Sequence, residues 1–219
     1  MIDINKLLCT EFNLKPTQVE STVKLIDEGN TIPFIARYRK EQTGSLDDVV
    51  LRDLFERLTY LRNLELRKEE VLRLIEEQGK LTDELKNEIL SADVLQRVED
   101  LYRPYKQKKS TRASKAKEKG LEPLAEIIMA QNIIEGDLEE IARPYIDEEK
   151  GVNNVKEAYE GACDIIAETV SDNADYRKHI REVYVNDAIL LSEAADEDEK
   201  TVYEMYYKFE EPVNKIANH

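Results

Sequence analysis

The chain has 219 residues, of which 41% are hydrophobic and 36% charged, and its net charge at pH 7 is −15. This composition supports a folded core and excludes a disordered or collagen-like chain, and the negative charge argues against indiscriminate binding to nucleic acid or to anionic membranes. Apolar runs stay far below the ~18–20 residues of a membrane helix, and the first residues do not read as a secretory signal. We therefore expect a cytoplasmic protein of one large or two small domains with no membrane partner.

Helix start and stop signals recur along the whole chain and predict an all-α fold, a multi-helix array with no significant sheet. We expect residues 1–44 to form an N-terminal helical subdomain that resembles a helix-turn-helix. Residues 45–195 are expected to form a helical scaffold, and residues 196–219 to be the truncated start of a further region.

The longest periodic segment, Leu46 to Gln78, predicts a spine helix about 50 Å long at ~1.5 Å per residue. Ser45 and Asp48 resemble a capping box at its start. A dimeric zipper would keep the seam apolar at Glu65 and Lys68, so we expect this helix to pack against others in the same chain. The apolar residues at helical spacing are Leu51, Leu54, Leu58, Leu61, Leu72 and Ile75.

Shorter helices are predicted downstream from capping residues and apolar spacing. Two of them end in the same Arg-Pro-Tyr sequence, at 103–105 and 143–145, an offset of 40 residues. A helical solenoid is one interpretation, but an array needs about three repeats, so we favour one helix-stop device used twice. The predicted helices span residues 82–89, 93–101, 112–119, 123–129, 137–143, 153–170 and 172–191.

Catalytic and metal-binding patterns are not evident. Two histidines and two cysteines without clustered spacing argue against a zinc site, and glycine patterns for a nucleotide cradle or a nucleophile elbow are missing. Cys163 and His179 can be imagined as a nucleophile–base pair, but we favour reduced, buried, inert thiols for both Cys163 and Cys9. The acidic run at 196–199 is interpreted as a solvated loop. We expect this chain to have no enzymatic activity and to bind no cofactor, metal or small-molecule substrate.

A basic segment is the main charge feature of the chain. Residues 103–119 hold eight cations and one acid, a net charge of +7, so the other 202 residues carry −22. Cations with nearby aromatic side chains can track a phosphate backbone; alternatively, the segment docks on the acidic remainder of the protein. The candidate nucleic-acid-binding residues in it are Lys106, Lys108, Lys109, Arg112, Lys115 and Lys119.

A second cationic cluster follows the short apolar stretch 32–36. It contains Arg37, Arg39 and Lys40, which either bind phosphate or interact with the carboxyl end of a short helix.

Several of these segments carry a family resemblance. The residues are NTIPFIARYRKEQTG at 30–44, LTYLR at 58–62, DLYRPYK at 100–106, TRA at 111–113, KGLEPLA at 119–125, YEMYY at 203–207 and EPV at 211–213. Over essentially its whole length the chain resembles the N-terminal helical region of the Tex family of bacterial transcription accessory proteins.

The resemblance implies a longer protein that continues into a ribonuclease-H-like domain, a helix-hairpin-helix element and an OB-fold RNA-binding domain. It implies that the full-length protein binds RNA or DNA, with RNA polymerase or ribosome-associated proteins as candidate protein partners. An alternative remains open, in which this region is a protein-interaction platform without direct nucleic-acid contact.

Overall fold

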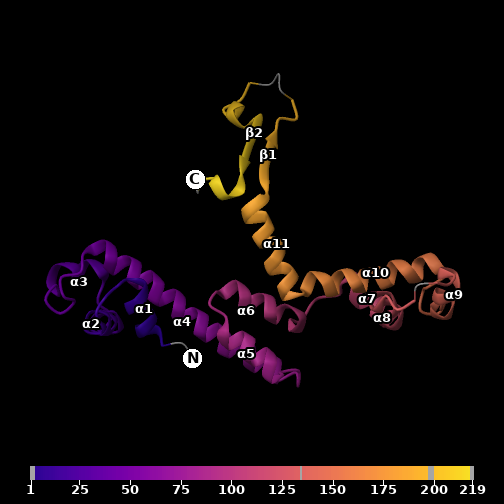
Figure 1. Ribbon diagram of the computed structural model, residues 1–219, viewed down its shortest axis with the longest axis horizontal. Helices are drawn as coiled ribbons and strands as arrows, with labels where there is room; N and C mark the ends of the chain where they lie inside the picture. The colour runs from indigo at the N-terminus through magenta and orange to yellow at the C-terminus, as the bar shows by residue number, and fades with distance from the viewer. Residues whose placement is uncertain (1–2, 134, 197–199, 218–219) are drawn as a thin grey trace. The chain divides into compact units, whose positions relative to one another are not determined.

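The computed structural model describes residues 3–133, 135–196 and 200–217 (Figure 1). The chain divides into two compact units, residues 1–102 (unit 1) and residues 103–219 (unit 2). Within the described residues the fold is predominantly α-helical, with one small two-stranded sheet. The predicted fold class is therefore confirmed, whereas the division at residues 44 and 195 stays a prediction.

Unit 1 is built from helices alone in the residues described. They are α1 (Ile4–Glu11), α2 (Pro16–Asp27), α3 (Ile32–Tyr38), α4 (Asp48–Glu76), α5 (Asp83–Ser91) and α6 (Leu95–Tyr102). Helix α4 contacts each of the other five, so it is the spine of this unit.

The spine helix is unbroken over 29 residues, as predicted, and each end lies two residues inside the predicted bounds. The predicted capping box at Ser45 is wrong. Ser45 has a left-handed backbone with φ of 65°, and the N-cap is Asp47, whose side chain accepts a 2.8 Å hydrogen bond from the Val50 amide. Asp47 fits this role because a short carboxylate reaches the free amides of the first helical turn.

The buried stripe of α4 confirms the predicted seam at both ends and corrects it in between, since Ile75 is buried as predicted whereas Leu72 is only half-buried. Leu51, Leu54, Leu58 and Leu61 are buried as predicted, each burial contributing about 1.5–3 kcal/mol. Further along, the stripe passes through the four residues whose spacing keeps them on one side of the helix. These are Leu64, Lys68, Val71 and Ile75.

Lys68 lies inside this stripe although it is charged. Its side chain is only 1% exposed, and its Nζ donates to Glu65 Oε1 at 2.8 Å and to the Leu90 carbonyl at 3.0 Å. A buried charge needs such a partner and such hydrogen bonds. The two charges that interrupt the apolar seam therefore form a buried pair.

Two arginines of α4 join it to the first two helices. Arg57 donates two hydrogen bonds to the Glu11 carboxylate, at 2.7 and 2.8 Å, and Arg62 makes the same paired contact with Asp27 at 2.6 and 2.9 Å. These hydrogen bonds lower the pKa of both carboxyl groups, because they favour the ionised form. These cations therefore serve packing within unit 1.

Unit 2 is organised around a second long helix. Its helices are α7 (Arg112–Glu118), α8 (Glu122–Ala130), α9 (Leu138–Ala142), α10 (Val155–Asp172) and α11 (Ala174–Asp187). The two Arg-Pro-Tyr sequences form 3₁₀ turns directly after α6 and α9, η1 (Arg103–Tyr105) and η2 (Arg143–Tyr145). This arrangement agrees with the helix-stop interpretation.

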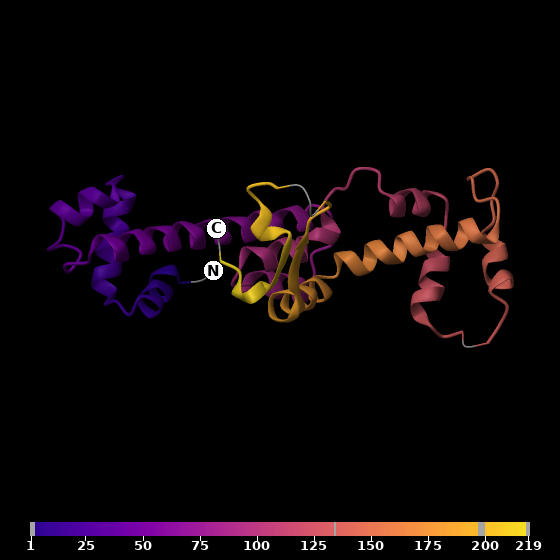
Figure 2. The same cartoon turned by 90° about the horizontal axis from the view of Figure 1, so that it is seen from above.

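Small residues let α7 approach α10 closely. Ala113 and Ala116 are buried against Ala158 and Ala162 in the core of unit 2, and α7 and α8 both lie against α10 in Figure 2. Gly161 faces the same contact, since a Cβ at this position would lie 2.3 Å from Leu121 Cδ1. The single glycine inside a helix is explained by this close packing.

A hairpin replaces the end of the last predicted helix. Helix α11 stops at Asp187, and Ile189–Glu193 (β1) pairs antiparallel with Lys208–Pro212 (β2), with Leu191 opposite Glu210. The prediction of helix through Leu191 is wrong because the strand is stabilised by a partner some twenty residues away, which local spacing does not reveal. Two further short turns, η3 (Glu204–Tyr206) and η4 (Val213–Lys215), complete the unit.

Candidate nucleic-acid interface

The basic segment, residues 103–119, runs through η1, an extended loop and α7. Thr111 caps α7, accepting a 3.0 Å hydrogen bond from the Ser114 amide, and Ser114 Oγ accepts one from the Thr111 amide at 2.8 Å. Because Ala113 and Ala116 face the core, the basic side chains of this helix are directed away from it. The local sequence thus sets which side of α7 carries the charge.

One group of cations in this segment is exposed and lies in the loop and on α7. Lys106, Lys109 and Lys115 are exposed, and within the part of the chain that the structure describes none of them forms an ion pair at 4 Å or less. These three ammonium groups are therefore available to an external anion.

A second group pairs with carboxylates on α10. Lys108 Nζ contacts Glu168 Oε1 at 3.2 Å and also pairs with Asp172, while Arg112 Nε lies 3.4 Å from Asp164 Oδ1. Arg103 Nε donates to Asp172 Oδ1 at 2.9 Å. For these cations the geometry corresponds to the docking interpretation of the basic segment.

Arg112, Lys115 and Lys119 are candidate residues with helical spacing, but they do not form one exposed face. Lys119 turns back into unit 2, where its Nζ donates to the Gly151 carbonyl at 2.8 Å. Lys117, which lies outside the predicted set, pairs with Glu122 at 2.7 Å. The structure therefore separates the predicted residues into exposed and internally bonded cations.

The second predicted cluster lies at the carboxyl end of α3 in unit 1. Arg39 lies over the Phe34 ring at 5.0 Å from its centroid, and its Nη1 donates to the Tyr38 carbonyl at 3.1 Å. Arg37 and Lys40 are exposed. Arg39 is thus bonded within its own helix end, while the two flanking cations face solvent.

Spacing alone could have revealed the acidic partners of the basic segment. Asp164, Glu168 and Asp172 lie four residues apart, which places their side chains on one side of α10. We call these three residues the carboxylate ladder.

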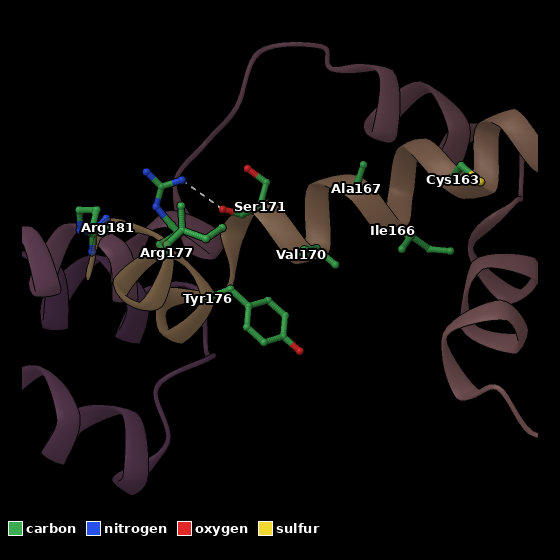
Figure 3. A pocket seen from close by; sticks show the side chains of 9 residues that line it. Cys163, Ile166, Ala167, Val170, Ser171, Tyr176, Arg177 and Arg181 are labelled. Carbon is green, nitrogen blue, oxygen red and sulfur yellow. Dashed lines mark hydrogen bonds between the residues drawn. The ribbon is translucent and has the colours of Figure 1, made fainter. Parts of the chain in front are cut away.

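An apolar cleft between α10 and α11 was missed by the sequence reasoning (Figure 3). It has a volume of about 640 Å³. Two of its lining residues are hydrogen-bonded to each other, since Arg177 Nη1 donates to the Ser171 carbonyl at 3.2 Å. The side chains lining it are Cys163, Ile166, Ala167, Val170, Ser171, Tyr176, Arg177, Ile180 and Arg181.

The cysteine prediction is wrong in its burial. Cys163 is exposed and Cys9 half-buried, and both thiols are free. Cys163 lies one position beyond Ala162 on α10, so it faces the cleft while Ala158, Ala162 and Ile165 face the core. His179 is exposed on α11 and does not line the cleft with Cys163.

The described ranges lack metal-binding clusters and membrane-spanning helices. Those residues contain no group of three or more His, Cys, Asp or Glu side chains arranged to hold a metal ion. Among the helices described, none combines the length and the apolar character needed to cross a bilayer. The predicted acidic loop at 196–199 lies largely outside the described residues, because 197–199 are not described.

Comparison with known proteins identifies two family matches. The model described as Tex-like protein N-terminal domain matches residues 2–76, and the one described as Tex central region-like matches residues 135–219. Together they cover most of both units.

Curated relatives match nearly the whole chain. Identity is 51% to the uncharacterized protein YdcI of Bacillus subtilis, over 99% of this chain and 30% of that protein. Identity is 40% to the transcriptional accessory protein Tex of Neisseria gonorrhoeae, over 100% of this chain and 28% of that protein. Human S1 RNA-binding domain-containing protein 1 is 26% identical, over 99% of this chain and 22% of that protein. The chain therefore spans less than a third of the length of these relatives.

Proposed function

The chain belongs to the Tex family, and we propose that it is the helical scaffold of a transcription accessory protein whose basic segment contacts RNA or DNA. The full-length protein would bind nucleic acid through this and further regions. We propose a cytoplasmic location and assign no enzymatic activity, cofactor or metal to this region. The division into 1–44, 45–195 and 196–219 remains part of the proposal.

The observation that carries the proposal is the set of exposed cations on the basic segment. Lys106, Lys109 and Lys115 are exposed, and Arg112 adds a guanidinium on a side chain that is 85% exposed. Such cations displace condensed counterions when they neutralise phosphates, which favours binding to a nucleic-acid backbone. Their concentration in one segment of an otherwise acidic chain supports a local contact surface.

The names of two relatives support the same proposal. One is called a transcriptional accessory protein and the other an S1 RNA-binding domain-containing protein. Since the chain spans less than a third of each of these proteins, their activities come to this region only as part of the proposal.

The proposal is tested by fluorescence anisotropy of labelled single-stranded RNA with the 219-residue chain. Four phosphate contacts on a single strand give a slope of about 3 in log affinity against log salt, so raising salt from about 50 to about 200 mM weakens binding roughly 50-fold. Reversing Lys106, Lys109 and Lys115 to Glu should abolish this binding.

A matched control changes the net charge by the same amount in unit 1. Lys24, Lys80 and Lys86 are also exposed, and their reversal to Glu should leave most of the affinity. If the two triple variants bind RNA equally well, the proposed surface is wrong.

A second candidate function is supported by the cleft between α10 and α11. Its apolar lining and the arginines at its rim, Arg177 and Arg181 (Figure 3), fit an amphipathic helix with acidic flanks. In this alternative the region is a protein-interaction platform for RNA polymerase or ribosome-associated proteins, without direct nucleic-acid contact.

This alternative is tested with purified RNA polymerase and purified ribosomes in gel filtration with the chain. Val170→Asp and Ile180→Asp place charges on exposed cleft positions and should abolish co-elution. Retained co-elution in both variants, or its loss in the Lys106, Lys109 and Lys115 reversal, contradicts binding through the cleft.

A further inference from the structure

The carboxylate ladder contacts the basic segment along two turns of α10. From its amino end the ladder meets Arg112 at Asp164 and Lys108 at Glu168. At Asp172 it meets Lys108 again and Arg103. Three carboxylates thus hold three cations of the segment that the proposed function places at a phosphate backbone.

Burial differs between the two sides of this contact. The Asp172 side chain is 11% exposed while its partner Arg103 is 44% exposed, and the difference is larger between Asp164 and Arg112. In these two pairs the arginine is therefore the outer partner, whereas the side chains of Lys108 and Glu168 are exposed to a similar extent. A phosphate approaching from solvent meets Arg112 and Arg103 before it meets the acids.

The three cations are also held with unequal strength. Lys108 contacts two carboxylates, whereas Arg112 makes a single contact at 3.4 Å. A long contact at an exposed side chain contributes about 0–1 kcal/mol, so Arg112 exchanges its partner most easily. Lys108 and Arg103 would exchange their partners after Arg112, because both pair with Asp172, the most buried carboxylate of the ladder.

We propose that the carboxylate ladder is an internal competitor of nucleic-acid phosphate for the basic segment. This inference rests on the proposed function and assigns its regulation. Without nucleic acid, the ladder neutralises Arg103, Lys108 and Arg112 and leaves Lys106, Lys109 and Lys115 as the first contacts. Each cation that moves to a phosphate gives up a carboxylate, so the ladder keeps binding weak and readily reversible.

The test compares single-stranded oligouridine binding by the full 219-residue chain and by Asp164→Asn/Glu168→Gln. Asp172 stays unchanged because it is buried and anchors two cations. The double variant should bind about threefold to tenfold more tightly, as expected from weak exposed pairs. Its salt slope should rise by about 0.7 for each additional phosphate contact.

The matched control is Glu77→Gln/Glu182→Gln. These acids are exposed and pair with Arg73 at 2.7 Å and with Lys178 at 3.9 Å, so the control makes the same change in net charge at positions outside α7 and α10. A ladder variant that binds no more tightly than this control overturns the inference. Weaker binding with an unchanged slope also overturns it, because the ladder would then position the segment rather than compete.

The failure of this inference differs from the failure of the proposed function. If the wild-type chain binds RNA and the Lys106, Lys109 and Lys115 reversal does not, a ladder variant equal to its control refutes the competition alone. If neither the wild-type chain nor the ladder variant binds RNA at low salt, both ideas fail.

Discussion

Removing the buried ammonium of Lys68 is the sharpest test of how unit 1 is held together. In Lys68→Ala, the Glu65 carboxylate, itself on a side chain only 12% exposed, loses this cation, and the Leu90 carbonyl loses its donor. Breaking a buried pair in this way costs about 3–5 kcal/mol. A loss of about 3 kcal/mol corresponds to roughly a 150-fold decrease in the protection of the affected amides.

Hydrogen exchange measured by mass spectrometry is the suitable assay, because it reports each part of the chain separately. Peptides from α4 and α5 should lose protection in Lys68→Ala, while peptides from α10 should keep it. Lys68→Met/Glu65→Leu should restore most of the protection, since well-packed apolar residues often replace a buried pair without cost.

The exposed pair Arg73–Glu77 on the same helix provides the control. Arg73→Ala should change protection by less than about fivefold, because exposed pairs contribute about 0–1 kcal/mol. If Lys68→Ala behaves like Arg73→Ala, the ammonium of Lys68 is not buried as described and the account of the α4 seam fails.

Three further predictions concern packing, acidity and thiol reactivity. Gly161→Val should lower the melting temperature of unit 2, because the new side chain overlaps Leu121 and overpacking costs about 1–3 kcal/mol. The hydrogen bonds from Arg57 lower the pKa of the Glu11 carboxyl in the folded chain. The ionised carboxylate therefore stabilises the fold above the ordinary pKa of 4.5, and this contribution disappears as the pH falls through the folded pKa. Below about pH 5, the stability of Glu11→Gln in urea unfolding should depend less on pH than that of the wild-type chain. Cys163 should react with a maleimide in the native chain, and its labelling should be complete before unfolding begins.

Each of these predictions has an outcome that contradicts it. Gly161→Val with the same melting temperature as Glu160→Val, a change on the exposed side of α10, rules out the close helix contact. If the stability of Glu11→Gln depends on pH in the same way as that of the wild-type chain, the paired contact with Arg57 is not a source of acid sensitivity. Cys163 that labels only in denaturant contradicts its place in the cleft.

Much of the helical framework could be predicted because the signals are local. The spine helix follows from 3–4 spacing, and Leu51, Leu54, Leu58 and Leu61 are buried as that spacing requires. The seam was misplaced only at Leu72, which is half-buried, because a charged residue, Lys68, occupies a buried position of the stripe. Its partner on the neighbouring helix, the Leu90 carbonyl, leaves no trace in a hydrophobic pattern.

For the candidate site, the sequence predicted the concentration of cations but not the contacts that each cation makes. The cluster of cations in residues 103–119 was evident, but spacing within this segment did not show that Arg112 and Lys108 turn toward α10. Which cations stay exposed depends on a helix some fifty residues downstream. The β1–β2 pairing and the cleft beside Cys163 depend on non-local contacts in the same way.

The most direct measurement of the central claim is a map of where nucleic acid contacts the chain. Single-stranded RNA containing 4-thiouridine, crosslinked to the 219-residue chain at low salt and mapped by mass spectrometry, should mark peptides from residues 103–119. The Lys106, Lys109 and Lys115 reversal should remove those crosslinks. Crosslinks that fall mainly in unit 1, or that persist in residues 103–119 after the reversal, would contradict the account.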